Sequence, residues 1–250
     1  MLFRPSITRP CWSPLTARCA TLDRLGSTIG SKAHRYGSQT ASRNLSLRLM
    51  PLGGSVTYGV GSSDRNGYRK FLQDMLHANG CQVRILGSRK SGSMDNNENE
   101  GWRGYRLDQI EAKARRSIAT IKPNIFTINA GSNDCIQDFQ LDRFGQRMSD
   151  MLEYLWRASP LSTVILSTLL VNADEEVNSR VLRVNSQLRD LALLKAAAQK
   201  RIVLADMNGT EGPQLDDLMD GTHPNDEGYK KMAHIWFSAI QKARTNGFLE

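Results

Sequence analysis

The 250-residue sequence has little cysteine, no long apolar run and almost no acidic residues near its start. Its four cysteines include no Cys-x-x-Cys pair, so neither a disulfide scaffold nor a structural zinc site is expected. No stretch approaches the roughly 18 uninterrupted apolar residues of a membrane helix, so we expect no membrane span. Hydrophobic residues make up 40% and charged residues 23%, which is typical of a globular domain.

Most of the net charge of +8 lies in residues 1–44, which hold seven basic residues and one acidic residue, Asp23. This arm is rich in Arg and Ser and lacks the apolar core of a secretory signal, a composition typical of a mitochondrial presequence. A disordered extension or a wrongly chosen start codon is the alternative, and a cytoplasmic location stays open. Residues 45–250 are nearly neutral and show no basic stripe, so we expect no nucleic-acid binding.

From Leu45 onward, short apolar segments alternate with amphipathic helical patterns. Strands are predicted at residues 47–52, 83–86, 125–129, 163–166 and 201–205. Helices are predicted at residues 67–80, 107–118, 141–155 and 177–194 and after Pro224, and residues 88–101 are predicted to form a polar loop. This alternation predicts one α/β domain with a five-stranded parallel sheet between two layers of helices. Functional groups of such sheets gather where the strands end, so the loops after the strands hold the candidate residues.

Ser55 follows the first predicted strand and two glycines, Gly53 and Gly54. Glycines let the backbone turn sharply and a substrate approach closely, so the Ser55 hydroxyl can be exposed at the sheet edge. The alternative is an ordinary turn in which Ser55 caps a helix.

Two further loops carry candidate side chains. Asn133 follows the third strand, where its amide can project into a cleft, although an Asn-Asp pair is also common in plain turns. Asp220 and His223 lie three residues apart before the last helix, and Asp220 can hold His223 in one tautomer. A surface turn with a solvated histidine is the alternative. Pro224 fits the first position of the helix that follows.

Patterns for phosphate, nucleotide and metal binding fail. Val60 stands where a P-loop needs Lys, and Asp64 stands where a dinucleotide fingerprint needs its third glycine. The Gly-x-Ser-x-Gly elbow is absent around Ser55. An EF-hand-like start at Asp95 has Glu100 in place of the required glycine.

Together, the blocks at residues 51–55, 99–104, 131–134 and 220–223 resemble the four motifs of the SGNH (GDSL-type) hydrolases. Gly54 stands where many members carry Asp. The details after Ser55 and around Gly104 look most like a fungal branch near carbohydrate esterase family 3. The resemblance covers nearly all of residues 45–250 and leaves the arm outside.

The resemblance implies a flavodoxin-like sheet of strand order 2-1-3-4-5, with no metal and no cofactor. It implies that Ser55 is the nucleophile, His223 the general base and Asp220 the residue that orients His223. The oxyanion would be bound by the backbone N–H groups of Ser55 and Gly104 and by the Asn133 amide.

The expected function is therefore hydrolysis of small acyl esters, above all acetyl esters on small molecules or carbohydrates, by a monomer. Lysophospholipase-like and thioesterase-like enzymes are alternatives, because the same blocks serve them. A non-catalytic binding domain is a distant alternative, since Ser55, Asn133 and His223 are all present. The polar segment 88–101 is expected to offer hydrogen bonds to a sugar. Carbohydrate-active relatives are usually secreted, which makes secretion a further alternative for location.

Overall fold

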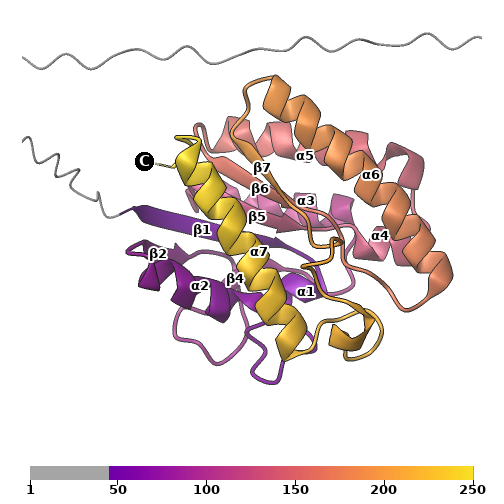
Figure 1. The fold of residues 1–250 in the computed structure, drawn as a ribbon. Helices are drawn as coiled ribbons and strands as arrows, with labels where there is room; N and C mark the ends of the chain where they lie inside the picture. Colours follow the sequence, from indigo (N-terminus) through magenta and orange to yellow (C-terminus); the bar gives the residue numbers. More distant parts are fainter. Residues whose placement is uncertain (1–44, 250) are drawn as a thin grey trace, which may run out of the picture. The chain divides into compact units, whose positions relative to one another are not determined.

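The strands of residues 45–249, the part of the chain that the computed structural model describes, form one seven-stranded sheet (Figure 1). Its strands are β1 (Ser46–Gly53), β2 (Gln82–Ile85), β3 (Arg89–Lys90), β4 (Glu98–Gly101), β5 (Ile125–Asn129), β6 (Thr163–Ser167) and β7 (Ile202–Ala205). Strands β5 and β6 are buried along their whole length, as expected of parallel strands covered on both faces. The predicted arm, residues 1–44, lies outside the described residues.

The order β2-β1-β5-β6-β7, with every pair parallel, confirms the predicted flavodoxin-like arrangement of five strands. Residues 88–101, predicted as a loop, instead contribute β3 and β4. Strand β4 is parallel to the end of β1, and β3 is antiparallel to β4. The prediction of a loop was wrong because these strands form through backbone pairing and carry polar side chains, so they have no apolar alternation.

Strand β1 contains a proline although it lies in the middle of the sheet. A central proline normally removes a ladder hydrogen bond. Here β1 pairs with β2 up to Leu49 and with β4 from Leu52 on, along the same edge. The carbonyls of Leu49 and Gly53 both accept hydrogen bonds at this edge. Pro51 lies two residues from each, so its nitrogen faces the gap between β2 and β4, where no donor is needed.

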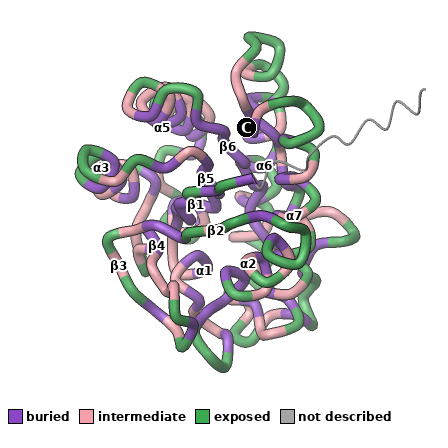
Figure 2. Tube along the Cα trace, turned by 90° about the vertical axis from the view of Figure 1, so that its left-hand side faces the viewer, coloured by how far each residue is buried: buried purple, intermediate pink, exposed green. Residues whose placement is uncertain are grey.

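The helices cover both faces of the sheet, which confirms the predicted three layers (Figure 2). Helices α2 (Tyr68–Ala78) and α7 (Asp226–Thr245) pack on one face, and α3 (Leu107–Ile118), α5 (Phe144–Ala158) and α6 (Glu175–Ala197) on the other. Short elements complete the list: α1 (Ser55–Tyr58), α4 (Ser132–Ile136) and two 3₁₀ turns, η1 (Leu141–Arg143) and η2 (Leu215–Asp217). None of the helices within residues 45–249 combines the length and the apolar character needed to span a membrane.

Each layer of helices has its own apolar core, and alternate residues of β1 supply both. Leu47 and Leu49 pack toward α2 and α7, while Met50 and Leu52 pack toward α3, α5 and α6. This division follows from the two-residue period of a strand, whose successive side chains point to opposite faces.

Helix α7 begins two residues later than predicted. Its N-cap is Asn225, whose side-chain oxygen accepts the Gly228 N–H at 3.0 Å. Pro224 therefore precedes the cap and forms an isolated bridge with Leu218. The side chain of Asn225 satisfies a free N–H of the first turn, which proline at the cap could not do.

Candidate active site

Four loops, which follow β1, β4, β5 and β7, bring the predicted site residues together. The Ser55 Oγ lies 2.7 Å from His223 Nε2, and His223 Nδ1 lies 2.7 Å from the Asp220 carboxylate. Ser55, His223, Gly104 and Asn133 line one cleft of about 540 Å³. A hydroxyl bonded to an imidazole that is in turn bonded to a carboxylate is the arrangement that activates a serine nucleophile.

Ser55 is the first residue of α1 and does not cap it, so the alternative interpretation as a cap is wrong. The N-cap is Gly54, which has no side chain to accept a hydrogen bond. The turn is tight: a Cβ on Gly53 would lie 2.1 Å from the Asn129 carbonyl oxygen. Only glycine fits there, and the close approach of β1 and β5 places Ser55 beside the loop that carries Asn133.

The loop between β7 and α7 holds His223 firmly. One Asp220 oxygen accepts the backbone N–H groups of Thr222 and His223 at 3.1 and 2.8 Å, and the other oxygen bonds the imidazole. Only 19% of the His223 side chain is exposed, so it is not a solvated surface histidine. Partial burial raises the pKa of Asp220, but the hydrogen bonds from His223 and Thr222 outweigh it and leave the pKa below its ordinary value.

A glycine brings the serine and histidine loops into contact. A Cβ on Gly61, where φ is +95°, would lie 2.4 Å from the Pro224 carbonyl oxygen and 3.1 Å from the His223 Cβ. The segment after Ser55 therefore packs directly against the residues that carry the imidazole.

The predicted oxyanion donors lie around Ser55. The Asn133 Nδ2 donates to the Tyr105 carbonyl at 3.1 Å, which uses one of its two N–H bonds and leaves the other. Gly104, with φ of +75°, lines the same cleft, and a Cβ added to it would meet no atom within 4 Å. A further hollow beside Ser55 and Asn133 has room for about 10 Å³, close to the size of one water molecule.

The polar segment 88–101 does not face the cleft, contrary to expectation: none of its residues lines it. Its side chains bond within the domain. Asn96 donates to a β2 carbonyl at 2.8 Å, and buried Asn99 donates to a serine hydroxyl at 3.0 Å. Buried Glu100 accepts a backbone N–H at 2.6 Å and the Trp102 indole N–H at 3.0 Å. The segment is polar because these groups hold β3 and β4 in place. The expectation that it offers hydrogen bonds to a sugar in the cleft was therefore wrong.

Arg69 is a residue that the sequence did not single out. It is 1% exposed and has no carboxylate partner within residues 45–249. Its guanidinium donates to the carbonyls of Tyr58, Arg65, Ser91 and Asn97 at 2.9–3.3 Å. Arg69 thus ties the loop after Ser55 to the connection between β3 and β4.

Asp134 is fully buried beside Asn133. It accepts the Leu107 N–H at 2.9 Å and pairs with Arg147 at 2.8 Å. Burial raises the pKa of Asp134, although the Leu107 N–H and Arg147 oppose the rise. Its bonds hold the start of α3 and the loop of Asn133 together.

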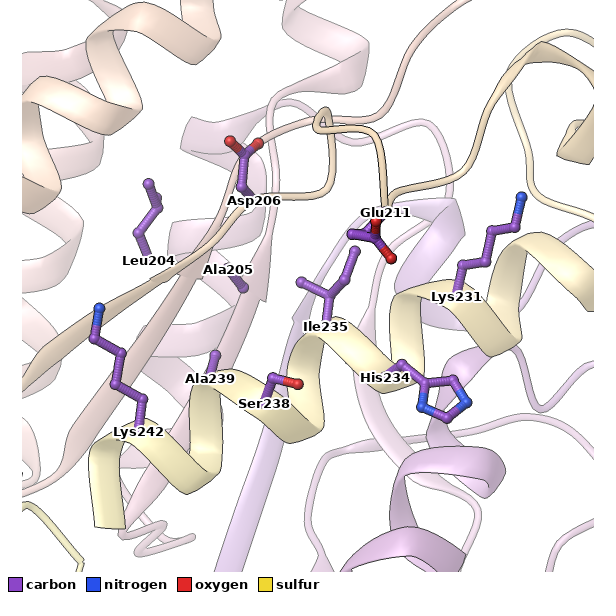
Figure 3. A pocket seen from close by; sticks show the side chains of 10 residues that line it. All are labelled: Leu204, Ala205, Asp206, Glu211, Lys231, His234, Ile235, Ser238, Ala239 and Lys242. Atoms are coloured by element: carbon purple, nitrogen blue, oxygen red, sulfur yellow. The ribbon is translucent and has the colours of Figure 1, made fainter. Parts of the chain in front are cut away.

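A different hollow of about 500 Å³ lies between β7 and α7 (Figure 3). It contains His234 and Ser238, but no hydrogen bond joins them, and the imidazole projects away from Asp206 (Figure 3). Asp206 is bound instead by Arg189 and Thr168. This hollow therefore lacks a serine–histidine pair. Residues 45–249 hold no group of three or more His, Cys, Asp or Glu side chains placed to bind a metal ion.

Comparison with known proteins identifies the family. A model of the GDSL-like lipase/acylhydrolase family matches residues 52–231, a range that includes Ser55, Gly104, Asn133, Asp220 and His223. The chain belongs to this family. The predicted resemblance to the GDSL-type hydrolases is thereby confirmed.

Relatives agree with that assignment. The chain is 28% identical over 224 residues to a multidomain esterase of Ruminococcus flavefaciens, in an alignment covering 78% of this chain and 28% of the relative. The chain thus spans 28% of that relative's length. A family 3 carbohydrate esterase from Clostridium thermocellum has a TM-score of 0.71 and 24% identity, covering 80% of this chain and 98% of the other. A carbohydrate esterase family 3 structure from Talaromyces cellulolyticus has a TM-score of 0.66 and 22% identity, covering 80% and 99%. These structures share the fold of the GDSL-like domain.

Proposed function

We propose that this GDSL-like protein is a serine esterase that removes small acyl groups, above all acetyl, from alcohols such as sugars. The observation that carries the proposal is the chain of two 2.7 Å contacts from Ser55 through His223 to Asp220, at the wall of an open cleft. An ester carbonyl in that cleft lies within reach of the Ser55 hydroxyl.

In the first half of the reaction, the Ser55 oxygen attacks the ester carbonyl carbon while His223 Nε2 takes the hydroxyl proton. The ionised Asp220 keeps the other ring nitrogen protonated and stabilises the imidazolium that forms. The oxygen that becomes negative is bound by the N–H groups of Ser55 and Gly104 and by the free N–H of Asn133. The C–O bond then breaks, and His223 returns the proton to the leaving alcohol.

In the second half, water attacks the acyl-serine. His223 again accepts a proton, now from water, and gives it to the Ser55 oxygen as the acid departs. The same three donors stabilise the second oxyanion.

The size of the hollow beside Ser55 favours a substrate with a small acyl group. The hollow bounded by Asn133 and the end of β5 has space for about one water-sized group, so an acetyl methyl fits and a long chain does not. The carbohydrate esterases that share the fold supply the substrates to test first.

A long-chain acylhydrolase is the second candidate, because apolar side chains also line the open cleft. Val56, Val60 and Ile136 lie there, and Ile136 is 44% exposed. Each buried CH₂ contributes about 0.8 kcal/mol when an apolar wall covers it. A chain lying in the open cleft would use this surface.

The test combines Ser55→Ala with a series of esters from acetyl to palmitoyl, including acetylated xylan. Loss of the nucleophile is expected to lower kcat on the order of 10⁶-fold. An organophosphate should label Ser55 in the wild type. The control is Ser132→Ala, which alters another serine of the same cleft and should keep labelling at Ser55.

Unchanged turnover in Ser55→Ala, or labelling elsewhere, would end the serine esterase proposal. Faster hydrolysis of palmitoyl than of acetyl esters would favour the long-chain candidate.

A further inference from the structure

A hollow of about 310 Å³ adjoins the catalytic cleft. Val60 and Arg103 line both, so a substrate in the cleft can extend into it. The loop after Ser55, residues 58–65, forms one side, and Met219 from the loop that carries His223 forms another.

The hollow lies beside the loop that carries His223. Gly61, in its wall, packs against the His223 Cβ and the Pro224 carbonyl. Met219, in the opposite wall, donates its N–H to the His223 carbonyl at 2.8 Å. Because His223 delivers the proton to the leaving oxygen, the alcohol part of the ester extends along this side of the imidazole.

The charged residues that line the cleft and the hollow are both arginines, Arg103 and Arg65. Both are exposed, and neither side chain donates a hydrogen bond or forms an ion pair within residues 45–249. The guanidinium carbon of Arg103 lies 6.0 Å from the centre of the Tyr58 ring, which is a distant contact. Neighbouring arginines are occupied: Arg69 bonds four carbonyls, and Arg89 lies 4.5 Å above the Trp102 ring.

No acidic side chain lines either space within the described residues. An anion there meets two guanidinium groups and no opposing carboxylate in the wall. Arginine presents several N–H donors in a plane that matches the oxygens of carboxylate and phosphate groups.

We propose that the alcohol part of the natural substrate carries an anionic group, a carboxylate or a phosphate, which Arg103 and Arg65 bind. The substrate class is thus an ester of an acidic sugar or a similar acidic alcohol. This inference rests on the proposed function, because it places the alcohol by the action of His223. Arg103 also directly precedes Gly104, so binding the anion positions the ester beside an oxyanion donor.

The experiment uses three acetylated methyl glycosides that differ only at carbon 6. The first is a neutral glucoside, the second a glucuronide and the third a glucoside 6-phosphate. The rate of acetate release is measured for each. At low salt, kcat/KM for an anionic substrate should exceed that for the neutral one about tenfold, equivalent to about 1.4 kcal/mol. The ratio should fall as salt is added, because exposed charges are screened.

Variants assign the effect to the two arginines. In Arg65→Gln/Arg103→Gln the ratio should fall to near one, while Arg103→Lys keeps part of it because the charge remains. The matched control is Arg116→Gln, an exposed arginine of α3 with the same change of charge, which should keep the wild-type ratio.

The carboxylate and phosphate substrates separate the two possible anions, and a preference for either supports the inference. Equal rates on all three substrates, or a ratio that survives in the double variant, would overturn it. If none of the three releases acetate while Ser55 stays unlabelled, it is the serine esterase proposal that has failed.

Discussion

At the scale of single residues, the Asn133 amide has two potential partners. It donates to the Tyr105 carbonyl in the resting protein and has one N–H left for the oxyanion. We expect Asn133→Ala to lower kcat by about 10²–10³ with a smaller effect on KM, because the bond strengthens as charge develops. Steady-state kinetics on a small acetate ester provide the measurement.

Asn133→Asp is the matched variant, since it keeps the shape and replaces the donors by a negative charge. It should be at least as slow as Asn133→Ala. An increase in KM with unchanged kcat would show that Asn133 binds substrate without serving the oxyanion.

Asp220 determines how the reaction should depend on pH. Its pKa lies below the ordinary value because hydrogen bonds from His223 and Thr222 outweigh partial burial. Asp220 is therefore ionised at and above the pH at which an ordinary histidine titrates, near 6.5. A neutral imidazole accepts the Ser55 proton and an imidazolium cannot, so kcat/KM should rise with pH through one ionisation.

Initial rates between about pH 4 and pH 9 test this behaviour. Asp220→Asn should lower kcat by roughly 10⁴, as loss of the orienting carboxylate does in serine hydrolases. A second ionisation on the acid limb, or inhibition by chelators, would contradict the assignment.

At the scale of elements, the turn after β1 imposes unequal demands on its two glycines. A Cβ on Gly53 would overlap the Asn129 carbonyl oxygen at 2.1 Å, whereas one on Gly54 would meet its nearest atom, Asn133 Nδ2, at 3.6 Å. Gly53→Ala should therefore lower the free energy of unfolding by about 1–3 kcal/mol. Gly54→Ala should leave it unchanged or raise it by up to about 1 kcal/mol, since the unfolded chain loses freedom.

Urea unfolding of the two variants provides the comparison. Equal losses of stability would show that the turn relaxes around either side chain.

The elements also show what the sequence could and could not predict. Strand β5 and helix α3 were predicted with the bounds observed, because their apolar residues follow the strand and helix periods closely. Strand β4, with the sequence Glu-Asn-Glu-Gly, has no such period. It forms by backbone pairing with Leu52 and Gly53 of β1, which its own sequence does not indicate.

Arg69 was missed for a related reason. It lies three residues before Leu72 and seven before Leu76, on the buried face of α2, which was a signal in the sequence. Two of its partners, however, are the carbonyls of Ser91 and Asn97, which lie 22 and 28 residues away, and no spacing predicts these. Ser55 and Asn133 were easier to single out, because each stands in a short block soon after an apolar strand.

At the scale of the whole molecule, the chain divides into two units, residues 1–41 and 42–250. The proposed site and both apolar cores lie in the second. A chain that begins at Ser42 should keep the melting temperature and kcat/KM of the full protein.

The control is a chain that begins at Met50, which lacks Leu47 and Leu49 and the half of β1 that pairs with β2. It should not fold, because a central strand and part of one core are missing. Loss of activity in the chain from Ser42 would show that the first unit takes part in function.

The two buried cysteines divide between the two cores: Cys81 lies in the core under α2 and α7, and Cys135 in the core under α3, α5 and α6. Burial raises the pKa of both thiols, that of Cys135 to about 12, so neither forms much thiolate in the closed protein. An alkylating reagent reaches each sulfur only when its own layer of helices opens. With Cys11 and Cys19 replaced by serine, the alkylation rates of Cys81 and Cys135 would report how often the helix layer on each face of the sheet opens. The alkylation rate of Cys135 would report the opening of α4, the short helix that also carries Asn133.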